Sequence, residues 1–139
     1  LALACAMSGV AMTLAAPVGH DLDQATISAV RELGGELTQT DDPAEAVRGA
    51  GAVYTDVWAS MGQEAEAEER TQLFRAYQVG APLMALAAPG AAFLHCLPAK
   101  RGQEVTDEVI DGPSSVVWPQ AANRLRAIRG LLLWMFGET

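Results

Sequence analysis

The chain has 139 residues, 50% of them hydrophobic and 19% charged, which is enough for one globular domain with its own core. The net charge of -8, from 9 basic and 17 acidic side chains, argues against nucleic acid or an anionic membrane as the main partner. Two cysteines far apart in the sequence form no disulfide framework, which favours a reducing cytoplasm.

Helical and strand-like patterns alternate along the whole chain. The opening, residues 1–17, is apolar, but Gly9 and Pro17 interrupt it and it lacks a basic flank, so it predicts neither a signal peptide nor a membrane span. The pattern predicts, in chain order, a helix over 1–7, a strand over 10–15, helix 22–33, strand 36–39, helix 43–48, strand 52–55, a polar acidic stretch over 60–70, helices 72–77 and 82–87, strand 91–95, a short helix between Thr106 and Gly112, strand 115–118 and helix 121–136.

Capping residues support several of these boundaries. Asp21 is expected to cap the helix over 22–33, and Asp41 or Asp42 the helix that starts at Pro43. The last helix is apolar on more than one side, which predicts either a central core helix or a helix that docks on another domain or subunit.

This alternation predicts an α/β domain: a doubly wound, Rossmann-like parallel sheet with helices on both faces, spanning residues 1–139 as one domain. The chain opens inside a helix, so the first strand of such a fold is missing and we expect a fragment. Open sheets of this kind bind ligands outside the carboxyl ends of their strands. The residues that follow Thr55, Leu94 and Val117 are therefore the first candidates for a site.

The first candidate is the stretch DVWASMGQE, residues 56–64. Asp56 stands where a strand leaves the sheet, and its carboxylate suits an ammonium group, although a cap on the next segment is an equally simple role. Gly62 permits a positive φ, and the backbone N–H groups of this loop could face a ligand carboxylate.

The second candidate is the stretch FLHCLPAKR, residues 93–101. Cys96 at a strand end could be a core residue, a nucleophile or a ligand contact. Adjacent strand residues point to opposite faces, so His95 and Cys96 form a dyad only if the backbone turns there. The sequence predicts no metal site, because His20 and Cys5 are the only other residues of their kinds. Lys100 and Arg101 are either solvated or in contact with an anion.

The third candidate is the stretch PQAANRLRAIRG, residues 119–130, which enters the last helix. Arg124 would lie near the helix N-terminus, which favours anions. Arg126 and Arg129 fall on other faces of the helix, as solvated side chains would.

Together these motifs resemble the ornithine carbamoyltransferase family. The matching pieces are TDVWASMGQE at 55–64, FLHCLPAKRGQEVTDEVIDGPSS at 93–115 and QAANRLRAIRGLLLW at 120–134. They stand in the family's order and spacing, and the resemblance covers essentially the whole chain. Ser60, Met61 and Gly62 together with Cys96 favour ornithine over aspartate or putrescine as the amine.

The resemblance implies transfer of a carbamoyl group from carbamoyl phosphate to the δ-amine of ornithine, giving citrulline and phosphate, without a cofactor. It implies that Asp56 pairs with the ammonium of the amino acid and that Ser60 and Met61 hold its amino-acid end. Cys96 and the Leu97 carbonyl would lie near the δ-amine, and Arg124 would reach the carbamoyl phosphate. It further implies a cytoplasmic homotrimer in arginine metabolism.

The chain also departs from the family. It lacks the amino-terminal half with the Ser-Thr-Arg-Thr-Arg loop that binds carbamoyl phosphate, so it cannot by itself hold a complete site. Ala122 and Arg126 stand where the family usually has Glu and His. The sequence therefore leaves three readings: the ornithine-binding half of such an enzyme, a related transferase for another amine or an acylated ornithine, and a non-catalytic remnant.

Overall fold

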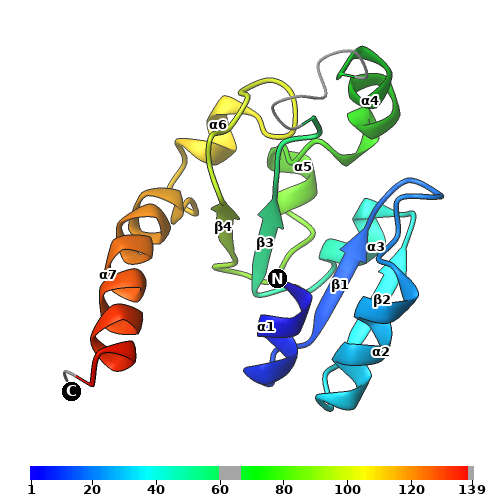
Figure 1. Cartoon of the computed structure of the whole chain (residues 1–139). Helices are drawn as coiled ribbons and strands as arrows, with labels where there is room; N and C mark the ends of the chain where they lie inside the picture. Colours follow the sequence, from blue (N-terminus) through cyan, green and yellow to red (C-terminus); the bar gives the residue numbers. More distant parts are fainter. Residues whose placement is uncertain (60–66, 138–139) are drawn as a thin grey trace.

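A computed structural model describes residues 1–59 and 67–137 (Figure 1). In chain order the elements are α1 (Ala2–Met7), β1 (Met12–Ala15), α2 (Gln24–Glu32), β2 (Leu37–Thr40), α3 (Pro43–Val47), β3 (Ala52–Thr55), α4 (Ala67–Phe74), the 3-10 helix η2 (Arg75–Tyr77), α5 (Ala81–Met84), β4 (Ala92–His95), α6 (Asp107–Ile110) and α7 (Val117–Met135).

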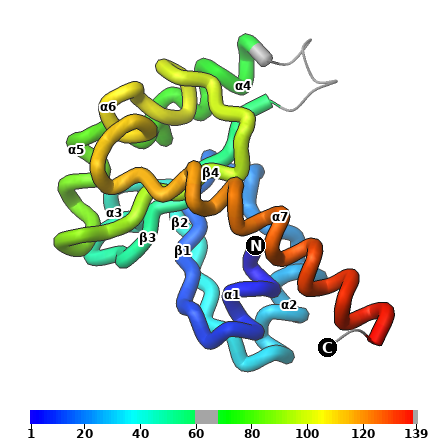
Figure 2. Tube along the Cα trace, turned by 90° about the vertical axis from the view of Figure 1, so that its left-hand side faces the viewer, coloured from blue at the N-terminus to red at the C-terminus, as the bar shows by residue number. Residues whose placement is uncertain are grey.

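The strands pair in parallel, as the alternating sequence pattern predicts. β1 pairs with β2, with Met12 opposite Leu37, and β3 pairs with β4, with Val53 opposite Phe93. Among the described residues these are two separate hydrogen-bonded pairs and not one continuous sheet. Figure 2 shows α1, α2 and α7 on one side of the strands and α3, α5 and α6 on the other, which confirms the expected α/β class with helices on both faces.

The prediction of a strand over 115–118 is wrong. Only Ser115 makes a bridge, to Phe93, through the bonds from Phe93 N–H to the Ser114 carbonyl and from Val116 N–H to the Phe93 carbonyl. Helix α7 begins at Val117, four residues before the expected start, and Pro119 lies in its first turn, where a missing N–H costs no intrahelical bond. A short β-branched run therefore precedes the helix but does not form a strand.

The predicted capping residue of α2 is also wrong. Asp23, and not Asp21, caps α2: its Oδ1 accepts from Thr26 N–H at 2.7 Å and its Oδ2 from the Thr26 hydroxyl at 3.1 Å. Leu22 stays outside the helix because its N–H donates to Gln39 Oε1 at 2.8 Å. At α3, Asp42 is the cap, accepting from Ala44 N–H at 2.8 Å.

Two separate apolar clusters hold the domain together. The larger consists of Val47, Val53, Val79, Phe93, Val105, Val109, Ile110 and Val117, and packs around β3 and β4. The smaller consists of Ala2, Ala6 and Val30, and joins α1 to α2. The larger cluster thus anchors the ends of β3 and β4 and the start of α7.

Gly35 allows α1 to approach α2. A Cβ added at Gly35 would lie 2.8 Å from the Ala6 Cα and closer still to the Ala6 Cβ, so α1 would have to shift. We expect Gly35→Ala to lower the stability of the full-length protein by about 1–3 kcal/mol, as overpacking does. Thermal unfolding would measure this. Gly51→Ala, where an added Cβ meets nothing within 4 Å, should leave the melting temperature nearly unchanged and is the matched control.

Helix α7 is not a core helix. Its second half carries exposed apolar side chains on all sides, and both views show it standing away from the rest of the chain (Figures 1 and 2). These side chains are Leu125, Ile128, Leu131, Leu132, Leu133, Trp134, Met135 and Phe136. Neither α7 nor any other described helix has the length and apolar character needed to cross a membrane.

Candidate functional site

Three segments meet at the carboxyl ends of β3 and β4. Asp56 follows β3, Cys96 and Leu97 follow β4, and the first turns of α7 face them. The turn after β4 and α7 enclose an open pocket of about 510 Å³, lined by Cys96, Leu97, Pro98, Ala99, Arg101, Ile110, Trp118, Ala121 and Arg124. The structure thus brings together three of the residues expected from the sequence, namely Cys96, Leu97 and Arg124.

The two guanidinium groups that line the pocket differ in their partners. Arg101 is bound to Asp111 at 2.7 Å and to Asp107 at 3.3 Å, so its charge is already balanced at the surface. Arg124 is exposed, at the end of the second turn of α7, and has no ion pair within the described ranges 1–59 and 67–137. Of the two, Arg124 is therefore the group available to an anion.

The Cys96 side chain faces Asp56 and Tyr54. Burial, together with the hydrogen bond and the charge of the nearby Asp56 carboxylate, raises the pKa of the Cys96 thiol above its usual value. Burial and the hydrogen bond with Cys96 raise the pKa of Tyr54 in the same way. Because a nucleophilic cysteine needs a lowered pKa, this environment keeps the thiol protonated and argues against covalent catalysis.

Asp56 is held by the backbone but keeps free acceptor capacity. Its Oδ1 accepts from Val57 N–H at 2.7 Å, which corresponds to the local capping role considered above. A carboxylate has room for several more hydrogen bonds, and this one lies beside Cys96, next to the pocket. Ser60 and Met61, the other expected amine contacts, lie outside the described residues.

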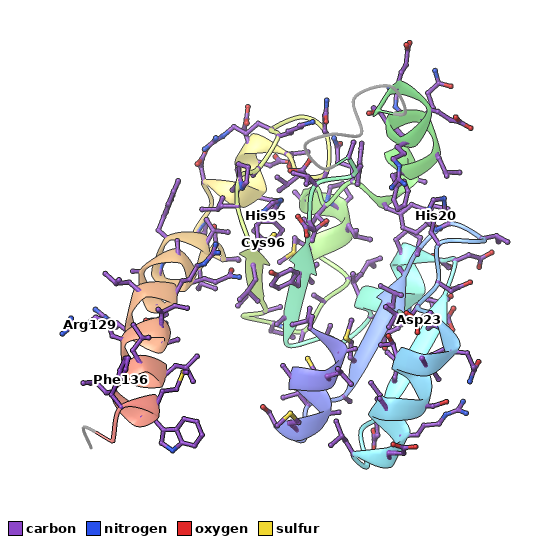
Figure 3. All side chains as sticks on the ribbon, in the orientation of Figure 1. His20, Asp23, His95, Cys96, Arg129 and Phe136 are labelled. Carbon is purple, nitrogen blue, oxygen red and sulfur yellow. The ribbon has the colours of Figure 1, made fainter. Side chains whose placement is uncertain are left out.

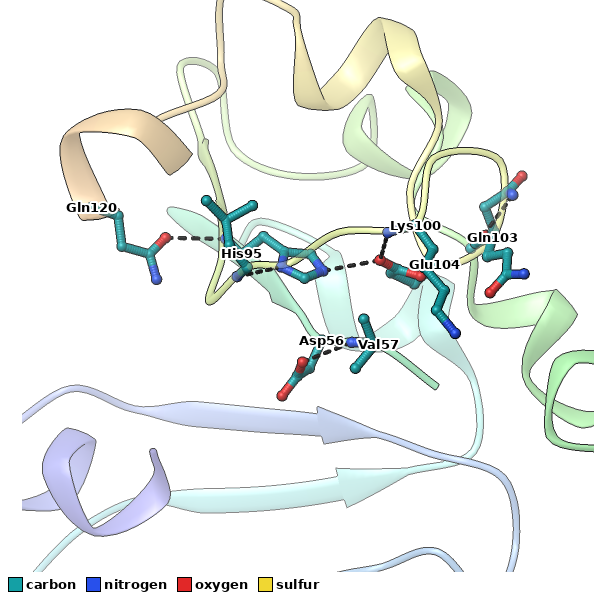
Figure 4. Close-up of polar contacts among 9 residues, drawn as sticks. Asp56, Val57, His95, Lys100, Gln103, Glu104 and Gln120 are labelled. Carbon is teal, nitrogen blue, oxygen red and sulfur yellow. Dashed lines mark hydrogen bonds and ion pairs between the residues drawn. The ribbon is translucent and has the colours of Figure 1, made fainter. Parts of the chain in front are cut away.

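His95 is structural and does not form a dyad with Cys96. Its ring is buried, accepts from Leu97 N–H at 2.8 Å through Nδ1, and contacts Glu104 Oε1 at 3.1 Å through Nε2 (Figure 4). Leu97 has a φ of 57°, so the backbone turns sharply right after Cys96. Figure 3 shows His95 and Cys96 near the strand ends, with Arg129 and Phe136 far along α7.

The sequence did not single out Glu104 and Gln120. Gln120 Oε1 accepts from His95 N–H at 3.0 Å, which ties the first turn of α7 to the end of β4. Glu104 is fully buried, a placement that its polar sequence neighbours do not suggest. The only feature of the sequence that could have pointed to Glu104 and Gln120 is that both lie inside the stretches that carry the family resemblance. Among the described residues, no group of three His, Cys, Asp or Glu side chains could hold a metal ion.

The raised pKa of Cys96 has a measurable consequence. In a Cys5→Ala background, the rate of Cys96 alkylation by iodoacetamide should rise with a midpoint above the pH of about 8.5 that is typical of a free thiol. Asp56→Asn should move this midpoint downward, because it removes the negative charge that opposes the thiolate. A midpoint below that of a simple thiol would contradict the placement of Cys96 beside the Asp56 carboxylate.

The fold and the pocket define a class of protein: an α/β domain with parallel strands and a ligand pocket at their carboxyl ends, lined by a cysteine side chain and an exposed guanidinium. Residues 1–135 match the family model described as Aspartate/ornithine carbamoyltransferase, Asp/Orn binding domain. The chain therefore belongs to the aspartate/ornithine carbamoyltransferase family, which confirms the resemblance drawn from its motifs.

Individual relatives agree with this assignment. The ornithine carbamoyltransferase of Methanothermobacter thermautotrophicus is 51% identical over 146 residues, covering 99% of this chain and 47% of that protein. The structure of the Pyrococcus furiosus ornithine carbamoyltransferase matches with a TM-score of 0.88 at 48% identity, over 95% of this chain and 44% of that one. Acetylornithine transcarbamylase, in complex with acetylcitrulline, matches with a TM-score of 0.76 at 29% identity, over 89% of this chain and 39% of that one. The chain thus spans less than half the length of these relatives.

Proposed function

We propose that the protein containing this chain transfers the carbamoyl group of carbamoyl phosphate to the δ-amine of ornithine, giving citrulline and phosphate. Residues 1–139 would be its ornithine-binding domain. The observation that carries the proposal is the single pocket shared by Cys96, Leu97 and Arg124, with Asp56 beside Cys96. A group that could bind an anion and a carboxylate that could bind an amine would then both lie close to Cys96.

The environments of Asp56, Cys96 and Arg124 support the roles proposed for them, whereas the roles of Ser60 and Met61 come from the family resemblance alone. Asp56 would pair with the ammonium of ornithine, and Ser60 and Met61 would hold its amino-acid end. Arg124, which is exposed and has no ion pair in the described part of the chain, would bind oxygens of carbamoyl phosphate. Cys96 and the Leu97 carbonyl would line the space for the δ-amine, with Cys96 as a neutral hydrogen-bonding group.

The reaction depends more on positioning of the two substrates than on covalent catalysis. A free δ-amine has a pKa of about 10.4, like lysine, and must lose a proton before it attacks the carbamoyl carbon. A closed pocket that excludes water disfavours the ammonium form and so favours this loss. The attack forms the new C–N bond and the C–O bond to phosphate breaks. The attacking nitrogen would give its second proton to the leaving phosphate, and Arg124 would balance the negative charge on that phosphate.

The rest of the protein would supply what this domain lacks. We propose that a carbamoyl-phosphate domain completes the site and covers exposed apolar side chains of α7, because the relatives are more than twice as long as this chain. We also propose that the whole protein is a cytoplasmic homotrimer that acts in arginine metabolism and uses no cofactor. Nucleic acid and membranes would not be partners, in keeping with the acidic composition.

A related transferase for an acylated ornithine is the second candidate, because acetylornithine transcarbamylase shares this fold. An amine panel separates the two: the full-length protein is given carbamoyl phosphate with ornithine, N-acetylornithine or putrescine, and the carbamoylated products are measured. We expect ornithine to give the highest kcat/KM, because Asp56 would bind the free ammonium that acetylation removes. A preference for N-acetylornithine would favour the second candidate, and no product from any amine would favour a non-catalytic remnant.

A further inference from the structure

The turn that follows β4 is built around a buried pair of polar side chains, His95 and Glu104. His95 is 1% exposed and Glu104 0%, whereas the carboxylates of Asp56, Asp107 and Asp111, also near the pocket, are exposed. The His95 Nε2 atom lies 3.1 Å from Glu104 Oε1 (Figure 4). Burying a carboxylate lowers the stability of a protein unless a specific partner compensates for the lost hydration. The burial of Glu104 against His95 therefore points to a specific role for this pair.

The hydrogen bonds of the ring fix its tautomer. Nδ1 accepts from the Leu97 N–H at 2.8 Å, so this nitrogen carries no proton. Nε2 therefore carries the proton and donates it to Glu104 Oε1. The carboxylate thus selects the one tautomer that lets His95 accept from the backbone next to Cys96.

Glu104 also holds the far end of the same turn. Its Oε1 accepts from Lys100 N–H at 2.6 Å, so one oxygen ties the His95 ring and the Lys100 backbone together. Between them Leu97 adopts a φ of 57°, a conformation that a leucine rarely adopts unless its surroundings impose it. Glu104 Oε2 is buried and makes no hydrogen bond in the described part of the chain.

The segment held in this way is the wall of the pocket. Cys96, Leu97, Pro98 and Ala99 all line it, and all lie between the two anchored points. The bond from Leu97 N–H to His95 holds the Cys96–Leu97 peptide, and so restricts the backbone from which the Cys96 side chain and the Leu97 carbonyl project. Neither His95 nor Glu104 lines the pocket itself, so both act through the residues between them.

We propose that Glu104, acting through the Nε2-protonated tautomer of His95, is a positioning residue that orients Cys96 and Leu97 toward the attacking amine. This inference rests on the proposed carbamoyl transfer for its kinetic readout. It predicts that the orientation of Cys96 and Leu97 requires a buried hydrogen-bond acceptor at position 104. It also predicts a requirement for an acceptor for the Leu97 N–H at position 95.

The kinetic test uses the full-length protein. Glu104→Gln keeps an acceptor oxygen for the ring and for Lys100 N–H, whereas Glu104→Ala keeps none. We expect Glu104→Ala to lower kcat by about 10²-fold, as misplacement of a reacting group does, with the KM for carbamoyl phosphate unchanged. Glu104→Gln should stay within about fivefold of the parent, since the acceptor oxygen shared by the ring and Lys100 N–H is kept. Equal losses in both variants, or a kcat of Glu104→Ala close to that of the parent, would overturn the proposal.

A second pair of variants covers the case in which Glu104→Ala does not fold. In the Glu104→Gln background, His95→Asn can accept from the N–H two residues on, as in an Asx turn, while His95→Phe cannot. We expect the Asn variant to keep a kcat at least about tenfold above that of the Phe variant. Equal kcat values in the two variants would overturn the role assigned to the ring.

A readout without turnover separates this inference from the proposed function. In a Cys5→Ala background, alkylation of Cys96 at fixed pH should be several times faster in Glu104→Ala than in the parent, because the turn is released, and close to the parent in Glu104→Gln. An unchanged alkylation rate in Glu104→Ala would contradict the positioning role even if carbamoyl transfer is confirmed. A faster alkylation rate in a protein that gives no citrulline would support the role of Glu104 in holding the turn and would contradict the proposed carbamoyl transfer.

Discussion

Replacing Arg124 by Gln should lower kcat/KM for carbamoyl phosphate by about 10²–10³-fold in the full-length protein, the loss typical of removing one preorganised donor to a developing negative charge. Arg124 lines the pocket and has no ion pair among the described residues, so its charge is available to phosphate oxygens. Steady-state kinetics with carbamoyl phosphate as the varied substrate measure the effect. Glutamine keeps much of the length and a donor but removes the charge and the paired N–H geometry.

Arg126 offers a matched control on the same helix. Its Nη1 donates to Asn123 Oδ1 at 3.2 Å, within α7, and it does not line the pocket. Arg126→Gln should therefore leave kcat/KM within about threefold of the parent, like most surface changes. If the two variants lose activity equally, Arg124 has no special role and the anion site lies elsewhere.

The second large effect is expected at Asp56, on the amine side. Asp56→Asn should lower kcat/KM for ornithine by about 10²-fold or more, because it leaves a bound ammonium without its counter-charge. The KM for carbamoyl phosphate should change little, since Asp56 lies beside Cys96 and is not among the residues that line the pocket near Arg124. Kinetics with each substrate varied in turn would separate the two effects.

Asp41 provides the control for this second prediction. It follows β2, as Asp56 follows β3, but lies at the other strand pair, where its backbone carbonyl accepts from the Tyr77 hydroxyl at 2.7 Å. Asp41→Asn should leave ornithine kinetics nearly unchanged. An equal loss at Asp41 and Asp56 would mean that general negative charge attracts the cationic substrate, and that Asp56 makes no specific contact.

Much of the site could be predicted from the sequence because its residues stand at the ends of recognisable elements. Short apolar runs at 52–55 and 91–95 marked two strands, and parallel strands place the residues after them at one edge. Asp56 and Cys96 became candidates by this rule, whereas Leu97 was added only by the family resemblance. Arg124 was predicted to lie near the N-terminus of the last helix, and the pocket that it shares with Cys96 agrees with that prediction.

The remaining features depend on contacts between distant residues. Val116 and Val117 favour a strand locally, but the chain turns into α7 after a single bridge at Ser115. Asp23 prevails over Asp21 as a cap because Leu22 N–H is bound by Gln39, on another element. Glu104 is polar by sequence and buried only because His95, nine residues earlier, meets it inside the turn. No local pattern contains that information.

The most direct test of the proposed function is citrulline formation by the full-length protein at millimolar ornithine and carbamoyl phosphate. The proposed function predicts citrulline and phosphate in equal amounts, with strong loss in Arg124→Gln and Asp56→Asn and little loss in Arg126→Gln. A folded full-length protein that produces no citrulline under these conditions would contradict it.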